Sequence, residues 1–258
     1  MTKELILSLI PGASEEQADK FIKYYELLIE WNEKMNLTAI TEEREVAEKH
    51  FADSLLPMEL IPQNARCIDV GTGAGFPGIP LMIMRPDITV TLLDSLNKRL
   101  IFLNEVIRAL GLEGRAKTLH MRSEDAGRAA AHRDAYDVAL SRAVANARVL
   151  AEWTAPFVKK GGVSIMYKGA AAKEELDAAQ NAMNKLCLGA RLIEYPCAWG
   201  ERYVIAAKSL PLRRRHIRAR RARRANCRCD SIVLTEAPAF CYNSACSKMG
   251  FFAEGKGN

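Results

Sequence analysis

The segment that most constrains the fold is a glycine-rich stretch at residues 67–78, with the sequence Cys-Ile-Asp-Val-Gly-Thr-Gly-Ala-Gly-Phe-Pro-Gly. It begins with a short apolar run that is interrupted by Asp69, and Gly71, Gly73 and Gly75 follow at alternate positions. This order predicts a buried strand followed by a turn, because glycine adopts backbone angles that are closed to other residues. Without side chains, the glycines also let the main chain lie against a ligand. The segment therefore predicts a ligand-binding loop at the end of a strand.

A second predicted strand, at residues 88–93, places Asp94 at its carboxyl end. In a doubly wound sheet, an acid about twenty residues beyond the glycine loop accepts hydrogen bonds from the hydroxyls of a ribose. Ser95 and Leu96 directly follow this acid, and we expect them to contact the same ligand. The two segments together predict a site for a ribose-bearing ligand.

The glycines satisfy two ligand-binding patterns at once. Residues 73–78 form a GxGxxG sequence, which is the fingerprint of dinucleotide-binding folds. Asp69 and the alternate glycines instead form the pattern typical of S-adenosylmethionine-dependent methyltransferases. An acid two residues before the first glycine can face the ammonium of a methionine moiety, which favours S-adenosylmethionine over a nicotinamide cofactor. A tight turn without a ligand is the third interpretation.

Predicted strands and helices alternate from residue 66 onward, which is typical of a mostly parallel sheet with helices on both faces. The strands are predicted at residues 66–70, 88–93, 116–121, 136–140 and 163–167, with a closing antiparallel pair at 191–195 and 203–207. The longer helices are predicted at residues 78–84, 96–110 and 173–186. Residues 61–208 are therefore predicted to form one α/β domain around a seven-stranded sheet.

Residues 1–60 are predicted to form a helical extension in front of this domain. The sequence Ser14-Glu-Glu-Gln17 has the form of a capping box, so a helix is predicted over residues 15–35. A second helix is predicted over residues 42–56. We expect the extension to be separate from the sheet and to form one wall of a cleft.

Further polar residues follow the third and fourth predicted strands. Ser123 and Glu124 come after the third strand, and Arg142 comes after the fourth. Taken singly, Glu124 and Arg142 are interpreted as ordinary surface groups. Ligands of doubly wound sheets bind outside the carboxyl ends of the strands, so the three residues are expected to surround one crevice with the glycine loop and Asp94.

The positive charge of the chain is concentrated in residues 209–258. This segment contains nine Arg and two Lys against three acidic residues, a net charge of +8. Residues 1–208 contain 26 basic and 28 acidic residues, a net charge of −2. The four cysteines of the segment match no zinc-binding spacing, so no metal site is predicted. We interpret residues 209–258 as a disordered basic tail.

Membrane association is not expected from the apolar segments. No apolar run approaches the roughly twenty residues that a membrane-spanning helix needs. The first residues, Met-Thr-Lys-Glu-Leu, lack the basic-then-apolar order of a secretory signal. The sequence therefore predicts a cytoplasmic protein.

Motifs at five places share the pattern of one known family. They are Asn36-Leu-Thr38, the segments at residues 50–55 and 69–80, Leu93-Asp-Ser95 with Lys98-Arg99, and Ser141-Arg-Ala143. With these motifs the chain resembles the small-subunit ribosomal RNA guanine-N7 methyltransferases, also called glucose-inhibited division protein B. The resemblance extends from the first helix to about Lys208 and implies a class I methyltransferase fold of the Rossmann-like type. It also implies methyl transfer from S-adenosylmethionine to N7 of one guanosine in the 530 loop of 16S rRNA.

The resemblance also assigns individual site residues. It implies that S-adenosylmethionine is contacted by Gly71, Phe76, Asp94, Ser123, Glu124 and Arg142. It suggests that Asn36, His50 and Asp53 lie on the substrate side, although a lone histidine on a helix is usually structural. The implied partner is 16S rRNA, the 30S subunit or an assembly intermediate of it, and the protein is expected to be a monomer.

Two other functions compete with this interpretation. A nicotinamide-dependent oxidoreductase would use the glycines of residues 73–78, but no second substrate domain or Tyr-x-x-x-Lys pair is evident. A non-catalytic RNA-binding protein would use the arginine run at residues 213–224, because arginine binds phosphate whatever the base sequence.

The tail departs from the ending of the family that the chain resembles. Members of that family end soon after the last strand, in a segment with a Tyr-Pro-Arg…Gly-Thr-Pro run. Codons permitted for residues 216–229, when translated from two bases later, spell Tyr-Pro-Arg-Ala-Ala-Gly-Thr-Pro-Arg-Glu-Leu-Pro-Leu. Our hypothesis is a frameshift close to Lys208, which would give the tail cysteines neither a metal nor a disulfide role.

Overall fold

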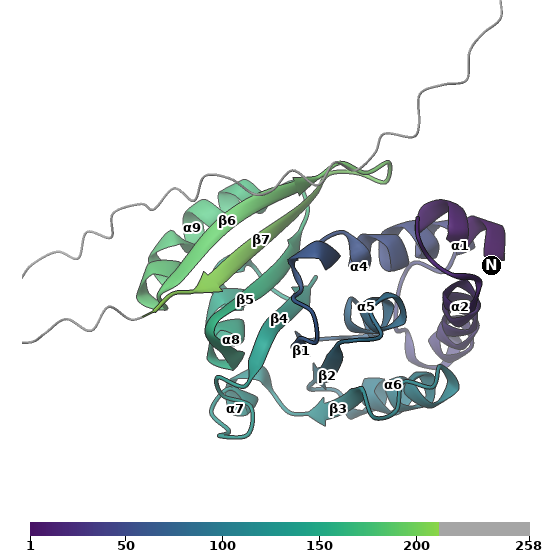
Figure 1. Cartoon of the computed structure of the whole chain (residues 1–258), viewed down its shortest axis with the longest axis horizontal. Helices are drawn as coiled ribbons and strands as arrows, with labels where there is room; N and C mark the ends of the chain where they lie inside the picture. The colour runs from purple at the N-terminus through teal and green to yellow at the C-terminus, as the bar shows by residue number, and fades with distance from the viewer. Residues whose placement is uncertain (212–258) are drawn as a thin grey trace, which may run out of the picture. The chain divides into compact units, whose positions relative to one another are not determined.

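The computed structural model describes residues 1–211, which form a seven-stranded sheet with helices on both faces (Figure 1). The strand order is β3-β2-β1-β4-β5-β7-β6. The strands are β1 (Arg66–Val70), β2 (Thr89–Asp94), β3 (Ala116–His120), β4 (Tyr136–Arg142), β5 (Val158–Lys168), β6 (Leu188–Tyr195) and β7 (Arg202–Ser209). β1 to β5 pair in parallel, and β7 is antiparallel to both of its neighbours. The predicted mostly parallel, Rossmann-like sheet is confirmed.

The direction of winding reverses at β1. This strand pairs with β2 on one side and with β4 on the other. The chain therefore first winds from β1 towards β3 and then crosses back to continue from β4 on the other side of β1. Such a reversal leaves a crevice outside the carboxyl ends of the adjacent strands. The glycine loop directly follows β1, and it is therefore placed at this crevice.

Helices cover the two faces of the sheet as separate groups (Figure 1). α5 (Gly78–Met84) and α6 (Asn97–Ala109) pack on one face together with α2 (Glu15–Met35). The other face carries α7 (Ser123–Ala126), α8 (Ala147–Thr154) and α9 (Ala172–Lys185). Side chains of β5 alternate between the two cores, since Ile165 packs in the first and Met166 in the second. The strands are buried on both faces, as a parallel sheet requires.

The N-terminal helices differ in two places from the sequence-based prediction. The predicted capping box at Ser14 is present, and α2 begins at Glu15. A short helix, α1 (Lys3–Leu9), precedes it and was not predicted. The second predicted helix is divided into α3 (Glu43–Val46), a π-helical segment (Ala47–Ala52) and α4 (Asp53–Leu55). π-Helical segments occur frequently at functional sites, and this one contains His50.

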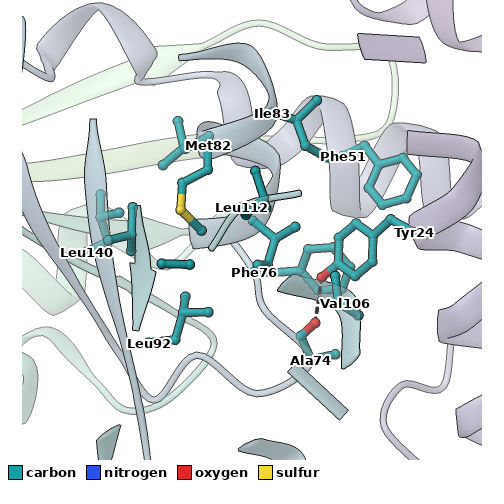
Figure 2. Packing of buried hydrophobic residues seen from close by; sticks show 14 of the residues in the cluster. Tyr24, Phe51, Ala74, Phe76, Met82, Ile83, Leu92, Val106, Leu112 and Leu140 are labelled. Atoms are coloured by element: carbon teal, nitrogen blue, oxygen red, sulfur yellow. Dashed lines mark hydrogen bonds between the residues drawn. The ribbon is translucent and has the colours of Figure 1, made fainter. Parts of the chain in front are cut away.

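The helical extension is not separate from the sheet, contrary to our expectation. Figure 2 shows Tyr24 and Phe51 of the extension packed beside Phe76, which follows the glycine loop. The ring centroids of Tyr24 and Phe76 are 5.4 Å apart, and those of Tyr24 and Phe51 are 5.5 Å apart. Burial of these large aromatic side chains favours a single core. The extension and the sheet therefore form one packed unit.

Element boundaries differ most at the last strands. β5 begins at Val158, before the predicted start at residue 163, and passes through Gly161 and Gly162. Its register with β4 shifts in this region, which lets the strand continue past the two glycines. β7 ends at Ser209, so the sheet extends one residue beyond the predicted domain. The predictions about the tail are its disorder, the absence of a role for its cysteines, and the frameshift. They concern residues from 212 onward, which lie outside the part of the chain that the structure describes.

The described residues show neither a membrane-spanning helix nor a cluster of metal ligands. No helix within residues 1–211 is long and apolar enough to cross a membrane. Over the same residues, no group of three or more His, Cys, Asp or Glu side chains is arranged to hold a metal ion.

Candidate active site

A cavity of about 440 Å³ lies at the carboxyl ends of the central strands, where the winding reverses. This volume is within the range of pockets that bind small molecules. The predicted site residues that line it are His50, Gly71, Gly73, Phe76, Asp94, Ser95, Ser123, Glu124 and Arg142. The predicted site residues that do not line it are Asn36, Asp53, Asp69, Gly75 and Leu96.

Asp69 supports the glycine loop from below instead of facing a ligand ammonium. Its side chain is fully buried, and its Oδ2 atom accepts hydrogen bonds from Thr72 Oγ1 at 2.8 Å and from Gly78 N at 2.9 Å. Burial raises the pKa of this carboxyl to about 6. The expected contact is wrong because Asp69 turns under the loop, where it connects the turn to the first residue of α5.

Gly73 and Gly75 have different roles in the loop. Gly75 has φ +102°, and a Cβ atom on it would lie 2.7 Å from Tyr24 Oη and 2.8 Å from Leu103 Cδ2. Tyr24 Oη donates a hydrogen bond to Ala74 O at 2.5 Å, so the loop is fixed from the side of α2 (Figure 2). Gly73 has φ +61°, lines the cavity and has no atom closer than 4.0 Å to the position of a Cβ. Gly75 is thus required by packing, and Gly73 is open towards a ligand.

We expect this difference to separate two alanine substitutions. Gly75→Ala should lower the free energy of unfolding by about 3 kcal/mol, because overpacking adds to the strain of a left-handed backbone. Gly73→Ala should lower it by only about 1–2 kcal/mol, from backbone strain alone, and should weaken cofactor binding. Urea unfolding and calorimetric titration measure the two quantities. Equal destabilisation by both substitutions would contradict the assignment of Gly75 to packing.

Asp94 lies between the glycine loop and α6 with its side chain almost fully buried. Its Oδ2 atom accepts hydrogen bonds from Gly73 N at 3.0 Å and from Arg99 Nη1 at 3.2 Å. Its Oδ1 atom accepts from Leu96 N at 2.9 Å. Leu96 contributes only its amide to this arrangement, because its side chain is exposed and does not line the cavity. These donors fix the orientation of the Asp94 carboxylate at the cavity wall.

Arg142 connects the sheet to the π-helical segment. Its Nη1 atom donates to Lys49 O at 3.1 Å and to Asp53 Oδ2 at 3.0 Å. Its guanidinium also lies over the ring of Phe76, with Cζ 5.0 Å from the ring centroid, a distance typical of a cation–π contact. Arg142 therefore holds the wall of the cavity that the extension contributes.

Asp53 lies behind this wall and not on the substrate side. Its Oδ1 atom accepts a hydrogen bond from Arg202 Nε at 2.5 Å and a longer one from Trp199 Nε1 at 3.3 Å. With Arg142 on Oδ2, the buried carboxylate has two guanidinium partners. The expectation of substrate contact is wrong because Asp53 is occupied in joining β4, the β6–β7 hairpin and α4.

His50 stacks against Phe76 with ring centroids 4.6 Å apart. Its Nε2 atom lies 2.9 Å from Thr38 Oγ1, and its Nδ1 atom lies 3.3 Å from Arg142 Nη2. Burial, assisted by the charge of Arg142, lowers the pKa of His50 to about 4. The imidazole is therefore neutral at physiological pH.

The lowered pKa of His50 gives a pH-dependent contribution to stability. Below the ordinary pKa of about 6.5 the unfolded chain binds a proton that the folded protein excludes, so this stability is lost as the pH falls from 6.5 towards 4. The wild type should therefore lose about 2 kcal/mol more than His50→Gln between pH 7 and pH 5. Urea unfolding of both proteins at each pH measures the difference. Parallel pH profiles would show that His50 is not held neutral.

Asn36 is exposed and does not line the cavity. It caps the carboxyl end of α2 in the left-handed conformation, with φ 49°, and its N–H donates to Asn32 O. This turn redirects the chain, so that the next two residues of the motif, Leu37 and Thr38, line the cavity in its place. The motif at residues 36–38 therefore reaches the cavity, but through Leu37 and Thr38 and not through Asn36, which was the residue selected from it.

Several cavity residues were not selected from the sequence. They are Leu37, Thr38, Val70, Thr72, Ala74, Leu93, Arg99, Met121, Arg122, Ala143, Val144 and Trp153. Arg99 could have been found because it belongs to the Lys98-Arg99 motif, and Arg122 because it directly precedes Ser123. Trp153 gave no local signal, since it reaches the cavity from α8 and its carbonyl accepts a hydrogen bond from Ser123 Oγ at 3.1 Å.

Comparison with protein families decides between the competing interpretations. The family model described as rRNA small subunit methyltransferase G (GidB) matches residues 17–199. The chain belongs to this family. Membership favours the methyltransferase interpretation of the glycine patterns over the nicotinamide interpretation.

Curated relatives agree with this family. The ribosomal RNA small subunit methyltransferase G of Alkaliphilus metalliredigens is 50% identical over 182 residues, which cover 70% of this chain and 75% of the relative. The protein of the same name from Desulforamulus reducens is 53% identical over 175 residues, which cover 67% and 72% of the two chains.

Solved structures support the class I methyltransferase fold. An O-methyltransferase from Bacillus cereus in complex with SAH matches with a TM-score of 0.54 and 13% identity, covering 80% of this chain and 96% of that one. A putative O-methyltransferase from Klebsiella pneumoniae matches with a TM-score of 0.54 and 17% identity, covering 81% and 95%. At this identity the likeness concerns the fold alone.

Proposed function

We propose that this family member transfers a methyl group from S-adenosylmethionine to N7 of a guanosine in the 530 loop of 16S rRNA. The observation that carries the proposal is a continuous cavity with two different walls. One wall consists of the glycine loop with Asp94, and the other consists of Thr38, His50 and Arg142. The first wall is suited to a nucleoside cofactor, and the second remains for a substrate base.

The residues of the first wall fit S-adenosylmethionine. The Asp94 carboxylate is fixed in orientation, and its Oδ1 atom, which accepts only from Leu96 N, retains a lone pair for a ribose hydroxyl. Because Gly73 has no side chain, the space beside it remains open as part of the cavity. Ser123 and Glu124 offer further polar atoms beyond β3. These features support binding of the adenosine part between the loop and the end of β3.

The proposed chemistry requires position more than proton transfer. S-Adenosylmethionine supplies a methyl group on a sulfonium, which is already a good leaving group. Guanine N7 carries a free lone pair and no proton, so no general base is needed. The chain's contribution is to hold the two reactants in line, which can supply ~7–11 kcal/mol of the barrier. A neutral His50 is compatible with such a site, because no proton has to be removed.

The position of N7 also defines the form of the RNA substrate. N7 lies on the edge of guanine that faces the deep, narrow major groove of an RNA helix, which side chains cannot enter. The target base must therefore lie in a loop or be turned out of its stack. This requirement supports a loop of 16S rRNA, presented by free RNA, the 30S subunit or an assembly intermediate.

Methylation of defined RNA tests the proposal. The protein is incubated with tritiated S-adenosylmethionine and either 16S rRNA or 30S subunits from a strain that lacks the modification. We expect label in one guanosine, identified as 7-methylguanosine after nuclease digestion. Glu105→Ala, at a half-buried position on α6 that does not line the cavity, serves as an active control. Label at another base or another guanine atom would overturn the N7 assignment.

A further inference from the structure

Thr38 has an unusual set of hydrogen bonds at the substrate wall. Its amide donates to Asn32 Oδ1 at 2.8 Å, which fixes the backbone at this position. Its hydroxyl oxygen accepts from Ile40 N at 3.1 Å and lies 2.9 Å from His50 Nε2. Both the residue and its histidine neighbour line the cavity. The direction of the bond to His50 decides what the hydroxyl proton can do.

The environment of His50 decides that direction. Nδ1 of the imidazole lies 3.3 Å from Arg142 Nη2, and a guanidinium nitrogen can only donate. We therefore assign Nδ1 as the acceptor and place the ring proton of the neutral imidazole on Nε2. Nδ1 is also 3.2 Å from Lys49 O, a contact that would favour the other tautomer. The positive charge of Arg142 beside Nδ1 favours the tautomer whose lone pair faces the guanidinium, because an N–H at Nδ1 would face another donor.

The Thr38 hydroxyl is consequently left with a proton to donate. Its oxygen accepts from Ile40 N–H and from His50 Nε2–H, which uses both lone pairs. Among the described residues, its proton has no protein acceptor at hydrogen-bonding distance. The free direction is towards the cavity that Thr38 lines. The chain Arg142–His50–Thr38 thus presents a hydrogen-bond donor on the substrate wall.

We propose that the Thr38 hydroxyl donates a hydrogen bond to O6 of the target guanine and thereby selects guanine against bases with an amino group at this position. The inference rests on the proposed N7 reaction. Guanine presents N7 and O6 side by side as acceptors, whereas adenine presents N7 beside an amino donor. A donor beside the reacting N7 therefore distinguishes the two purines. Thr38 is a specificity-determining residue, and His50 and Arg142 position it.

The same arrangement leaves N7 free for the reaction. Both terminal nitrogens of Arg142 are engaged, Nη1 with Lys49 O and Asp53, and Nη2 with His50. His50 Nε2–H is directed to Thr38. The N–H groups engaged in these contacts are therefore not directed at the lone pair that must attack the methyl group. The wall offers a donor for O6 through Thr38 without masking N7.

The test combines two enzyme variants with two substrates. Ligated 16S rRNA carries at the target position either guanosine or 2,6-diaminopurine riboside, which keeps N7 and replaces O6 by an amino group. The wild type should prefer guanosine by at least about tenfold in kcat/KM, as expected for a site that hydrogen-bonds its substrate. Thr38→Val should reduce this preference by about tenfold, and Thr38→Ser, which keeps the hydroxyl, should retain it within about threefold.

The outcomes separate specificity from a structural role. If Thr38→Val lowers activity on both substrates equally and keeps the preference, Thr38 only supports the fold and the inference is overturned. If the wild type methylates the target guanosine but accepts diaminopurine equally well, the inference fails while the N7 assignment stands. If no 7-methylguanosine forms with guanosine and the wild type, the proposed function itself fails.

The tautomer of His50 gives an independent measurement on the wild-type protein. Nitrogen-15 NMR of the imidazole, assigned by comparison with His50→Gln, should show a proton on Nε2 and none on Nδ1 at neutral pH. A proton on Nδ1 would make Thr38 the donor to His50, and no hydroxyl proton would be available for guanine. That result would overturn the inference even if Thr38→Val did not fold.

Discussion

Replacement of Asp53 by alanine is expected to lower the free energy of unfolding by about 3–5 kcal/mol, because it leaves buried charge without a partner. The Asp53 side chain is 7% exposed and holds Arg142 at 3.0 Å and Arg202 at 2.5 Å. Arg142 is itself only 12% exposed, so water cannot replace the lost carboxylate. Urea unfolding monitored by circular dichroism gives the change in free energy.

The matched control is Asp125→Ala. Asp125 also faces an arginine, Arg128, but at 3.9 Å and with both side chains exposed. Exposed pairs of this kind contribute ~0–1 kcal/mol, so the control should be close to the wild type. Asp53→Asn should lie between the two, since the amide oxygen can accept one of the hydrogen bonds. A loss below about 1 kcal/mol for Asp53→Ala would show that the two arginines do not depend on it.

Replacement of Asp94 by alanine should weaken S-adenosylmethionine binding by roughly ten- to a hundredfold. Hydrogen bonds to a charged acceptor contribute about 1.5–3 kcal/mol, and Asp94 is the carboxylate on the loop wall that we propose to bind the ribose. The substitution also removes the acceptor for Gly73 N, which loosens the glycine loop. Isothermal titration calorimetry measures the affinity directly.

Two comparisons make the Asp94 result specific. Glu105→Ala removes a carboxylate of α6 that does not line the cavity, and this variant should bind the cofactor as the wild type does. Thermal unfolding without cofactor should show that Asp94→Ala remains folded, so that weaker binding is not a loss of structure. An affinity that stays within about twofold of the wild type would refute the ribose role of Asp94.

Much of the fold could be predicted because its signals are local. The bounds of β1 and α5 agree with the predicted residues, since an apolar strand, a glycine turn and a proline-containing helix follow one another without interruption. The capping box at Ser14 also acts within one turn of helix. The π-helical segment was not predicted, because the spacing of apolar residues along a helix does not show that one turn contains an extra residue.

The candidate site was predicted well where residues follow a strand directly. Gly71, Asp94 and Arg142 each stand at the carboxyl end of a parallel strand, and the topology alone brings such positions together. The errors concern residues whose side-chain direction the sequence pattern does not show. Asp69 turns towards α5, and Asp53 turns towards the β6–β7 hairpin. The partners of Asp69 lie in the same glycine-rich segment, whereas Arg142 and Arg202 lie 89 and 149 residues from Asp53.

The sequence by itself determined the class of fold, the family and the position of the cofactor loop, because these depend on the order of strands, glycines and acids along the chain. Only the tertiary structure decided which polar groups meet. Arg142 lies 92 residues beyond His50, and the two meet because the extension, which carries His50 and Thr38, packs against Phe76 in the same core as the sheet. The direction of each hydrogen bond then follows from Arg142, whose guanidinium nitrogens can only donate.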